Sequence, residues 1–171
     1  MVMEKWFVFG LDADLDVALK CQAQGNHAEA ASHFEVCLEK GAPLKVCTIA
    51  RRHLIDSLLA MARDSQAEGR PLEAVSLIQR AVTVQPEFAD LRLRLALAYR
   101  EVGDLDAAAK EVDEALKLNG KFRRARLLQV WLAHQREGFD QAKELWRSAA
   151  TDLELLDGPT DEDDWMAHIE A

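Results

Sequence analysis

The chain has 171 residues, of which 49% are hydrophobic, and a net charge of −9. This length and apolar content suffice for one domain with a continuous core. Eight acids and no lysine or arginine fall within residues 148–171, so residues 1–147 carry a net charge of only −1. The phosphates of a nucleic acid would be repelled by the acidic end, which argues against nucleic acid as a general partner.

Residues 1–10 form an N-terminal arm with a short apolar run at residues 6–9. This arm either packs over the first hairpin or pairs with another molecule. It lacks the length and the small-residue cleavage site of a signal peptide, and no apolar run in the chain is long enough to predict a membrane span. The three cysteines include no C-x-x-C pair, which fits reduced thiols. We therefore expect a cytoplasmic location.

A helical hairpin is predicted over residues 11–42, with its turn at Gly25. His33 and Cys37 lie one helical turn apart in its second helix and could face one metal ion. Two ligands without a nearby third make a structural role the expectation. No metal site and no cofactor are predicted.

One long helix is predicted from about Pro43 to Gln66. The spacing between equivalent turn glycines grows here to 44 residues from the 34 found further along the chain, and the inserted residues contain no glycine or proline. A proline fits the first turn of such a helix. Arg51, Arg52 and His53 lie on the extension, either as a solvated face or as a patch that binds an anion or a partner.

The rest of the chain repeats a helix–turn–helix pattern with a period of 34 residues. Gly103 can end one helix with a positive φ, and Asp104 can cap the next. The turn of the last hairpin, at Gly138, comes one residue later than this period predicts. The small residues that recur with this period, here called the 34-residue grid, are Gly69 and Gly103, then Ala74, Ala108 and Ala142, then Ala81, Ala115 and Ala149.

Two segments on this grid share a recognisable motif. They read Leu58-x2-Met61-Ala62-x2-Ser65…Ala74-x3-Ile78…Pro86 and Arg92-x2-Leu95-Ala96-x2-Tyr99…Ala108-x3-Val112. This resembles the tetratricopeptide repeat, W-x2-L-G-x2-Y…A-x3-F…P over 34 residues. The resemblance implies an all-α fold, an α-solenoid of about four helix–turn–helix repeats with a C-terminal capping helix. The repeats are expected at about 11–44, 45–88, 89–122 and 123–157, followed by an acidic tail at 158–171.

The tail contains a capping-box pattern that begins at Thr160 and predicts a short helix with Trp165, Met166 and Ile169 on its apolar face. This helix either caps the fourth repeat or lies in a groove, its own or a neighbour's, where Arg124 and Arg126 attract its acids. Self-association through the arm or the tail is accordingly one expectation.

The sequence predicts no enzyme, because it contains none of the nucleotide-binding, zinc-protease or serine-hydrolase motifs. In the family it resembles, the first helices of successive repeats line a concave groove that holds a peptide or a helix of another protein. Leucines on these first helices could instead pack in the core between helices, which is the alternative to a groove. The groove positions by repeat register are Leu59, Arg63, Gln66, Leu93, Leu97, Arg100, Arg124, Leu127, Trp131 and His134.

Two function classes follow from this resemblance. The first is a scaffold or adaptor that brings protein partners together. The second is a dedicated chaperone for one client, similar to the small acidic tetratricopeptide chaperones of bacterial secretion systems. Relatives that clamp a C-terminal carboxylate use lysine and asparagine at two of these places. This chain has either Leu15 and Leu19 or Leu59 and Arg63 there, so that activity is not expected.

Overall fold

The computed structural model describes residues 12–153, with side chains as far as residue 148. Within that range every regular element is a helix, which confirms the predicted all-α fold. The N-terminal arm, the last residues of the fourth hairpin and the predicted tail helix lie outside the described residues. The helices are α1 (Ala13–Ala23), α2 (His27–Glu39), α3 (Leu44–Ala67), α4 (Pro71–Val84), α5 (Ala89–Glu101), α6 (Leu105–Leu118), α7 (Arg123–Glu137) and α8 (Phe139–Leu153).

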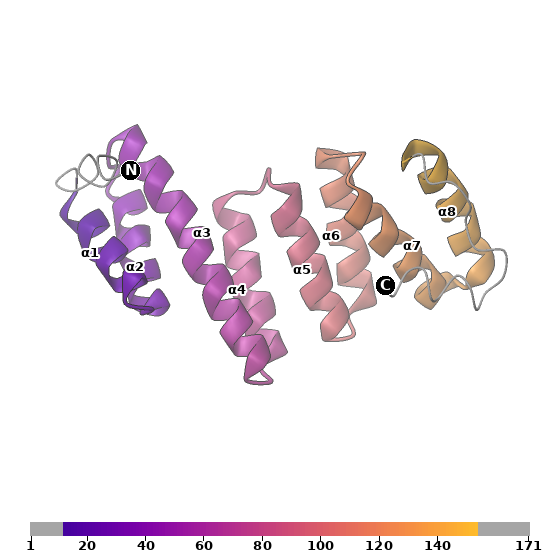
Figure 1. Ribbon diagram of the computed structural model, residues 1–171, viewed down its shortest axis with the longest axis horizontal. Helices are drawn as coiled ribbons and strands as arrows, with labels where there is room; N and C mark the ends of the chain where they lie inside the picture. Colours follow the sequence, from indigo (N-terminus) through magenta and orange to yellow (C-terminus); the bar gives the residue numbers. More distant parts are fainter. Residues whose placement is uncertain (1–11, 154–171) are drawn as a thin grey trace. The chain divides into compact units, whose positions relative to one another are not determined.

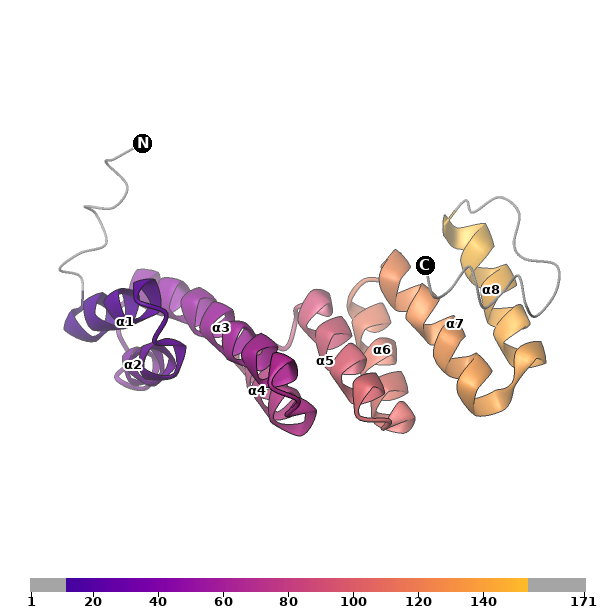
Figure 2. The same cartoon turned by 60° about the horizontal axis from the view of Figure 1, so that its bottom comes forward.

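Consecutive helices pair as antiparallel hairpins, as the sequence predicts (Figure 1). The chain divides between Gln85 and Pro86 into two compact units, one holding α1–α4 and the other α5–α8. In the first unit α2 packs against both α1 and α3, and α3 packs against α4. In the second unit each helix packs against the next one along the chain, from α5 to α8 (Figure 2).

The long helix predicted after Pro43 is confirmed as α3, whose 24 residues correspond to about 36 Å. The predicted turn chemistry is also present. Gly103 has φ = 82°, a value that glycine adopts without the steric cost of a Cβ. The next residue, Asp104, accepts a hydrogen bond from the backbone N–H of Ala107 at 3.0 Å and so caps α6.

Small residues on the 34-residue grid lie where helices touch. All five described alanines of the grid are fully buried: Ala74, Ala81, Ala108, Ala115 and Ala142. A small side chain at a contact lets two helix axes approach closely, so the period of the alanines determines which faces of the helices meet.

The second unit contains two clusters of buried side chains. One, between α5, α6 and α7, consists of Leu93, Ala96, Ala108, Val112, Ala115, Ala125, Leu128 and Leu132. The other, between α7 and α8, consists of Val130, Ala133, Ala142 and Trp146. Because α7 contributes to both clusters, its two buried flanks are fixed and its remaining face is left for solvent or a partner.

Candidate functional site

Three predicted groove residues lie in the first unit, on one face of α3. Leu59 and Gln66 are half-buried and Arg63 is exposed. The Nε of Arg63 donates a hydrogen bond to the backbone oxygen of Leu59 at 3.3 Å, so the guanidinium lies back along its own helix. This face combines one aliphatic side chain with polar neighbours.

On α5 the predicted groove residues separate into core and surface. Leu93 is only 2% exposed and belongs to the cluster between α5, α6 and α7. Its side chain is therefore not open to a partner in this structure, which agrees with the alternative of an interhelix role. Leu97, one turn further along, is half-buried at the edge of the same cluster, and Arg100 is exposed.

The four predicted residues on α7 share one face of the helix. Arg124 is exposed, whereas Leu127, Trp131 and His134 are half-buried. Trp131 packs against the cluster between α5, α6 and α7, and Leu127 packs against the cluster between α7 and α8. The guanidinium carbon of Arg100 lies 5.2 Å from the centroid of the Trp131 ring, within the range of a cation–π contact.

This contact joins α5 and α7 into one surface in the second unit. We call it the α5–α7 surface and define it as Leu97, Arg100, Arg124, Leu127, Trp131 and His134. It has an apolar middle, formed by two leucines and an indole, and arginines at its margins. A half-buried indole with arginine beside it is a composition that recurs at the energetic centres of protein interfaces.

The beginning of α7 carries an excess of positive charge. Lys121, Arg123 and Arg124 are exposed there, and the first turn of the helix contains no acid. Within the described part of the chain, neither Arg123 nor Arg124 forms an ion pair. At the other end of the same helix, in contrast, the guanidinium of Arg136 lies 2.8 Å from a carboxylate oxygen on α6.

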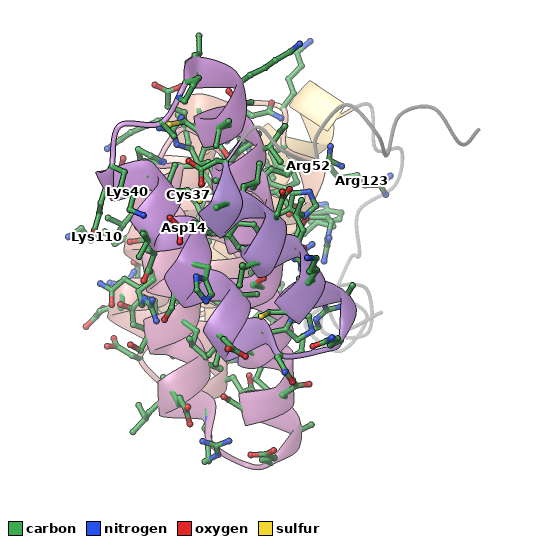
Figure 3. The ribbon with its side chains drawn as sticks, turned by 90° about the vertical axis from the view of Figure 1, so that its left-hand side faces the viewer. Asp14, Cys37, Lys40, Arg52, Lys110 and Arg123 are labelled. Carbon is green, nitrogen blue, oxygen red and sulfur yellow. The ribbon has the colours of Figure 1, made fainter. Side chains whose placement is uncertain are left out.

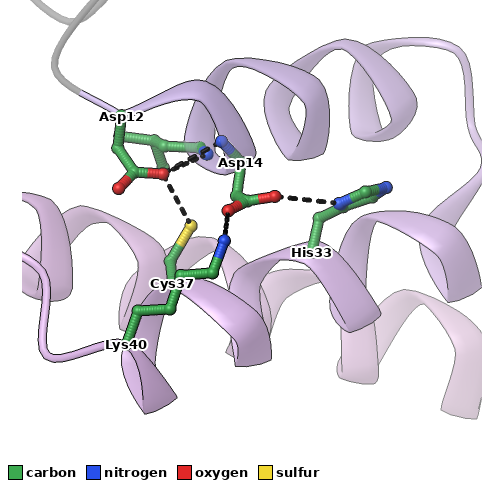
Figure 4. A network of polar contacts seen from close by, with 6 residues as sticks. Asp12, Asp14, His33, Cys37 and Lys40 are labelled. Atoms are coloured by element: carbon green, nitrogen blue, oxygen red, sulfur yellow. Dashed lines mark hydrogen bonds and ion pairs between the residues drawn. The ribbon is translucent and has the colours of Figure 1, made fainter.

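A polar network that the sequence did not predict joins α1 to α2 (Figures 3 and 4). Asp12 accepts hydrogen bonds from the backbone N–H of Asp14 at 2.9 Å and from the Cys37 thiol at 3.6 Å. Asp14 pairs with Lys40 and lies 3.8 Å from Nδ1 of His33. Burial, and then the nearby Asp12, raise the pKa of Cys37 to about 11. The thiol is thus protonated at neutral pH, and the network holds two helices together.

His53 departs from the predicted patch on α3. Arg51 and Arg52 are exposed, but the imidazole of His53 is turned inward, and its Nδ1 lies 2.7 Å from Oε1 of Gln22 on α1. The ring also stacks on Phe34 of α2, with centroids 5.8 Å apart. Burial lowers the pKa of His53. This histidine therefore connects three helices, and of the three residues in the predicted patch the two arginines are exposed.

A pocket of about 190 Å³ lies between α6, α7 and α8. Its apolar lining includes Leu132, Ala133 and Leu145, and Asp113 and Gln129, which also line it, share a hydrogen bond of 3.1 Å. Residues 12–148 contain no group of three or more histidine, cysteine, aspartate or glutamate side chains placed to bind a metal ion. No helix in the described range is long and apolar enough to cross a membrane.

Comparison with known proteins agrees with the motif found in the sequence. Residues 65–132 match the model of the tetratricopeptide repeat family. A search of curated proteins found no match.

Solved structures with the same fold span most of the chain. A crystal structure of MamA aligns with a TM-score of 0.56 at 17% identity, covering 90% of this chain and 96% of MamA. TTC0263, a thermophilic tetratricopeptide protein of Thermus thermophilus, aligns with a TM-score of 0.50 at 18% identity, covering 92% and 95%. The first tetratricopeptide domain of Spaghetti (RPAP3), bound to the HSP90 peptide SRMEEVD, aligns with a TM-score of 0.53 at 16% identity, covering 68% and 89%.

Proposed function

We propose that the chain is a non-enzymatic protein-interaction module built of tetratricopeptide repeats, and that it binds a peptide or an amphipathic helix of another protein. The proposal assigns the contact to the first helices of the repeats, as the family resemblance implies. In the second unit the binding site is the α5–α7 surface. In the first unit it is the face of α3 that carries Leu59, Arg63 and Gln66.

The observation that carries this proposal is the α5–α7 surface itself. Trp131 and Leu97 are anchored on the core cluster by one edge, so their positions are fixed before a partner arrives. Anchored apolar side chains lose little conformational entropy on binding. The exposed arginines at the margin can pair with acidic groups, which favours a partner segment with one apolar and one acidic face. The structure of RPAP3 with an HSP90 peptide gives a precedent for peptide binding on this fold.

Capture of partners from the native host tests the proposal. The wild-type chain is compared with Trp131→Ala and Arg100→Glu, which remove the indole and reverse the charge beside it. Loss of an aromatic hot spot costs about 2 kcal/mol or more, which is about 30-fold in affinity. We expect partners captured by the wild type to be depleted accordingly in both variants, with helicity by circular dichroism unchanged.

A matched control uses Leu118→Ala. Leu118 is an exposed aliphatic residue on α6, a second helix of a repeat, with 45% of its surface accessible. Its removal should leave capture unchanged. Equal capture by the wild type, Trp131→Ala and Arg100→Glu would move the site away from the α5–α7 surface and would contradict the proposal.

The dedicated chaperone is the second candidate function. It is supported by the acidity of residues 148–171, which suits a small protein that keeps a client in solution. Stoichiometry separates the two candidates. One client that co-purifies in a fixed ratio favours the chaperone, and several partners in small amounts favour the scaffold. A cytoplasmic location, expected from cysteines without a pairing pattern, is part of either proposal.

A further inference from the structure

The start of α7 has the opposite charge from the one that a helix favours at this end. The N-terminus of a helix carries a partial positive charge, so basic side chains in its first turn are unfavourable and an anion nearby is stabilising. Lys121, Arg123 and Arg124 concentrate three positive charges at this position, and the two arginines have no ion pair within residues 12–148. This end of the α5–α7 surface is therefore suited to an acidic ligand.

The last described helix ends beside the beginning of α7. Helices α7 and α8 have 15 residues each and run antiparallel from the turn at Gly138. The end of α8 at Leu153 therefore returns to the side of α7 on which the helix begins. The sequence then continues with residues 154–171, which contain seven acids and no lysine or arginine.

We propose that the chain's own segment 161–169 docks on the α5–α7 surface. Its acids at 161–164 pair with Arg123 and Arg124, and Trp165 and Ile169 cover Leu127 and Trp131. Because this is the surface of the proposed function, the inference rests on that function and adds its regulation. The segment competes with a partner, and only partners that displace it are bound.

The chain lengths involved are sufficient for this pairing. Packed helices lie about 8–10 Å apart, whereas the eight residues from Leu153 to Asp161 can span about 26 Å when extended. The seven residues from Arg124 to Trp131 extend over about 10 Å of helix, and the six residues from Asp163 to Ile169 would extend over about 9 Å in the helix that the sequence predicts. In both segments the charged group comes first in the chain and the apolar group follows.

Zero-length carbodiimide cross-linking of the full chain tests the proposal without any partner. Lys121 is exposed beside the two arginines, so we expect it to be joined to an acid of residues 161–164 within one molecule. Mass spectrometry of the monomer band identifies the linked peptides. Lys110 on α6 is exposed as well but lies outside the surface, and it should give no such product.

The variant Arg123→Glu/Arg124→Glu removes the charge complementarity. Loss of two exposed ion pairs should lower the ratio of docked to undocked segment about 2- to 30-fold, with a matching loss of the Lys121 product. The matched control is Arg51→Glu/Arg52→Glu, which changes two exposed arginines on α3 by the same charge. It should leave the product unchanged. Glutamates suit the first turn of a helix, and circular dichroism verifies that both variants are folded.

Three results would overturn the inference. The first is an equal yield of the Lys121 product in both double variants. The second is linkage of residues 161–164 to Lys110 as often as to Lys121. The third is linkage only between two molecules, which would assign the surface to a second copy. Each outcome is independent of partner capture, so failure here leaves the proposed function intact, and failure of the Trp131→Ala test leaves the docking of the segment intact.

Discussion

The substitution Ala108→Arg tests the packing of the second unit most directly. Ala108 is fully buried on α6, inside the cluster between α5, α6 and α7. Arginine adds a long side chain where two helices meet and brings a charge that has no partner there. Overpacking costs about 1–3 kcal/mol, and an uncompensated buried charge costs about 3–5 kcal/mol. A total of about 4 kcal/mol or more is therefore expected.

Such a loss is large compared with the total stability of about 5–15 kcal/mol that is typical of a domain. For a chain of this size it lowers the melting temperature on the order of 10 °C, which circular dichroism at the helix band measures. Ala67→Arg is the control, because Ala67 is the exposed last residue of α3 and a cation suits that end of a helix. An unchanged melting temperature for Ala108→Arg would show that the assignment of the helix faces is wrong.

Three further substitutions or conditions give independent tests. Asp104→Ala removes the cap of α6 and should reduce the free energy of unfolding by about 1 kcal/mol in urea titration, whereas no change would mean that the cap contributes nothing. Phe34→Ala empties a fully buried site in the first unit and should cost about 3–5 kcal/mol in the same assay. The pKa of His53 is lowered by burial, so its contribution to stability is fully present above about pH 6.5 and is lost as the pH falls below that value. His53→Gln should flatten this part of the pH profile, and a profile identical to the wild type would rule out His53 as its source.

The hairpins could be predicted from the sequence because their determinants are local. A glycine with positive φ, an aspartate cap and small residues at a fixed period act within one or two helical turns. The long α3 followed from the same reasoning, since the inserted residues contain nothing that ends a helix. Even the late turn of the last hairpin is reproduced, with α7 ending at Glu137 and Gly138 at φ = 95°.

Pairs of polar side chains on different helices could not be predicted, because they depend on the distance and crossing angle of the helices. Arg92 occupies the position where the repeat motif has tryptophan. Its guanidinium lies 2.9 Å from a carboxylate oxygen of Glu111 on α6, and only 20% and 14% of the two side chains are accessible. The sequence placed Arg92 on the motif but gave no indication of its partner. His53 and Gln22 are a second pair of this kind.

The binding surface could be predicted only in part, for a related reason. Leu93 and Leu97 are one turn apart and have the same position relative to the apolar pattern of α5. Leu93 lies inside the cluster between α5, α6 and α7 and is buried, whereas Leu97 lies at the edge of that cluster and remains half-exposed. Periodicity identifies the face of a helix, but the extent to which the next helix covers that face depends on packing.

The contact between Arg100 and Trp131 is weak enough for an arriving ligand to displace the arginine from the indole ring. A cation over an aromatic ring at an exposed site contributes about 0.5–1 kcal/mol, so moving the arginine aside costs little. Covering apolar surface yields about 1 kcal/mol for each 40 Å² removed from water. A segment that buries the indole and the neighbouring leucines therefore gains more than it loses by displacing Arg100. The displaced guanidinium is then free to pair with an acid of the arriving segment, which gives an acidic amphipathic ligand an advantage over a neutral one.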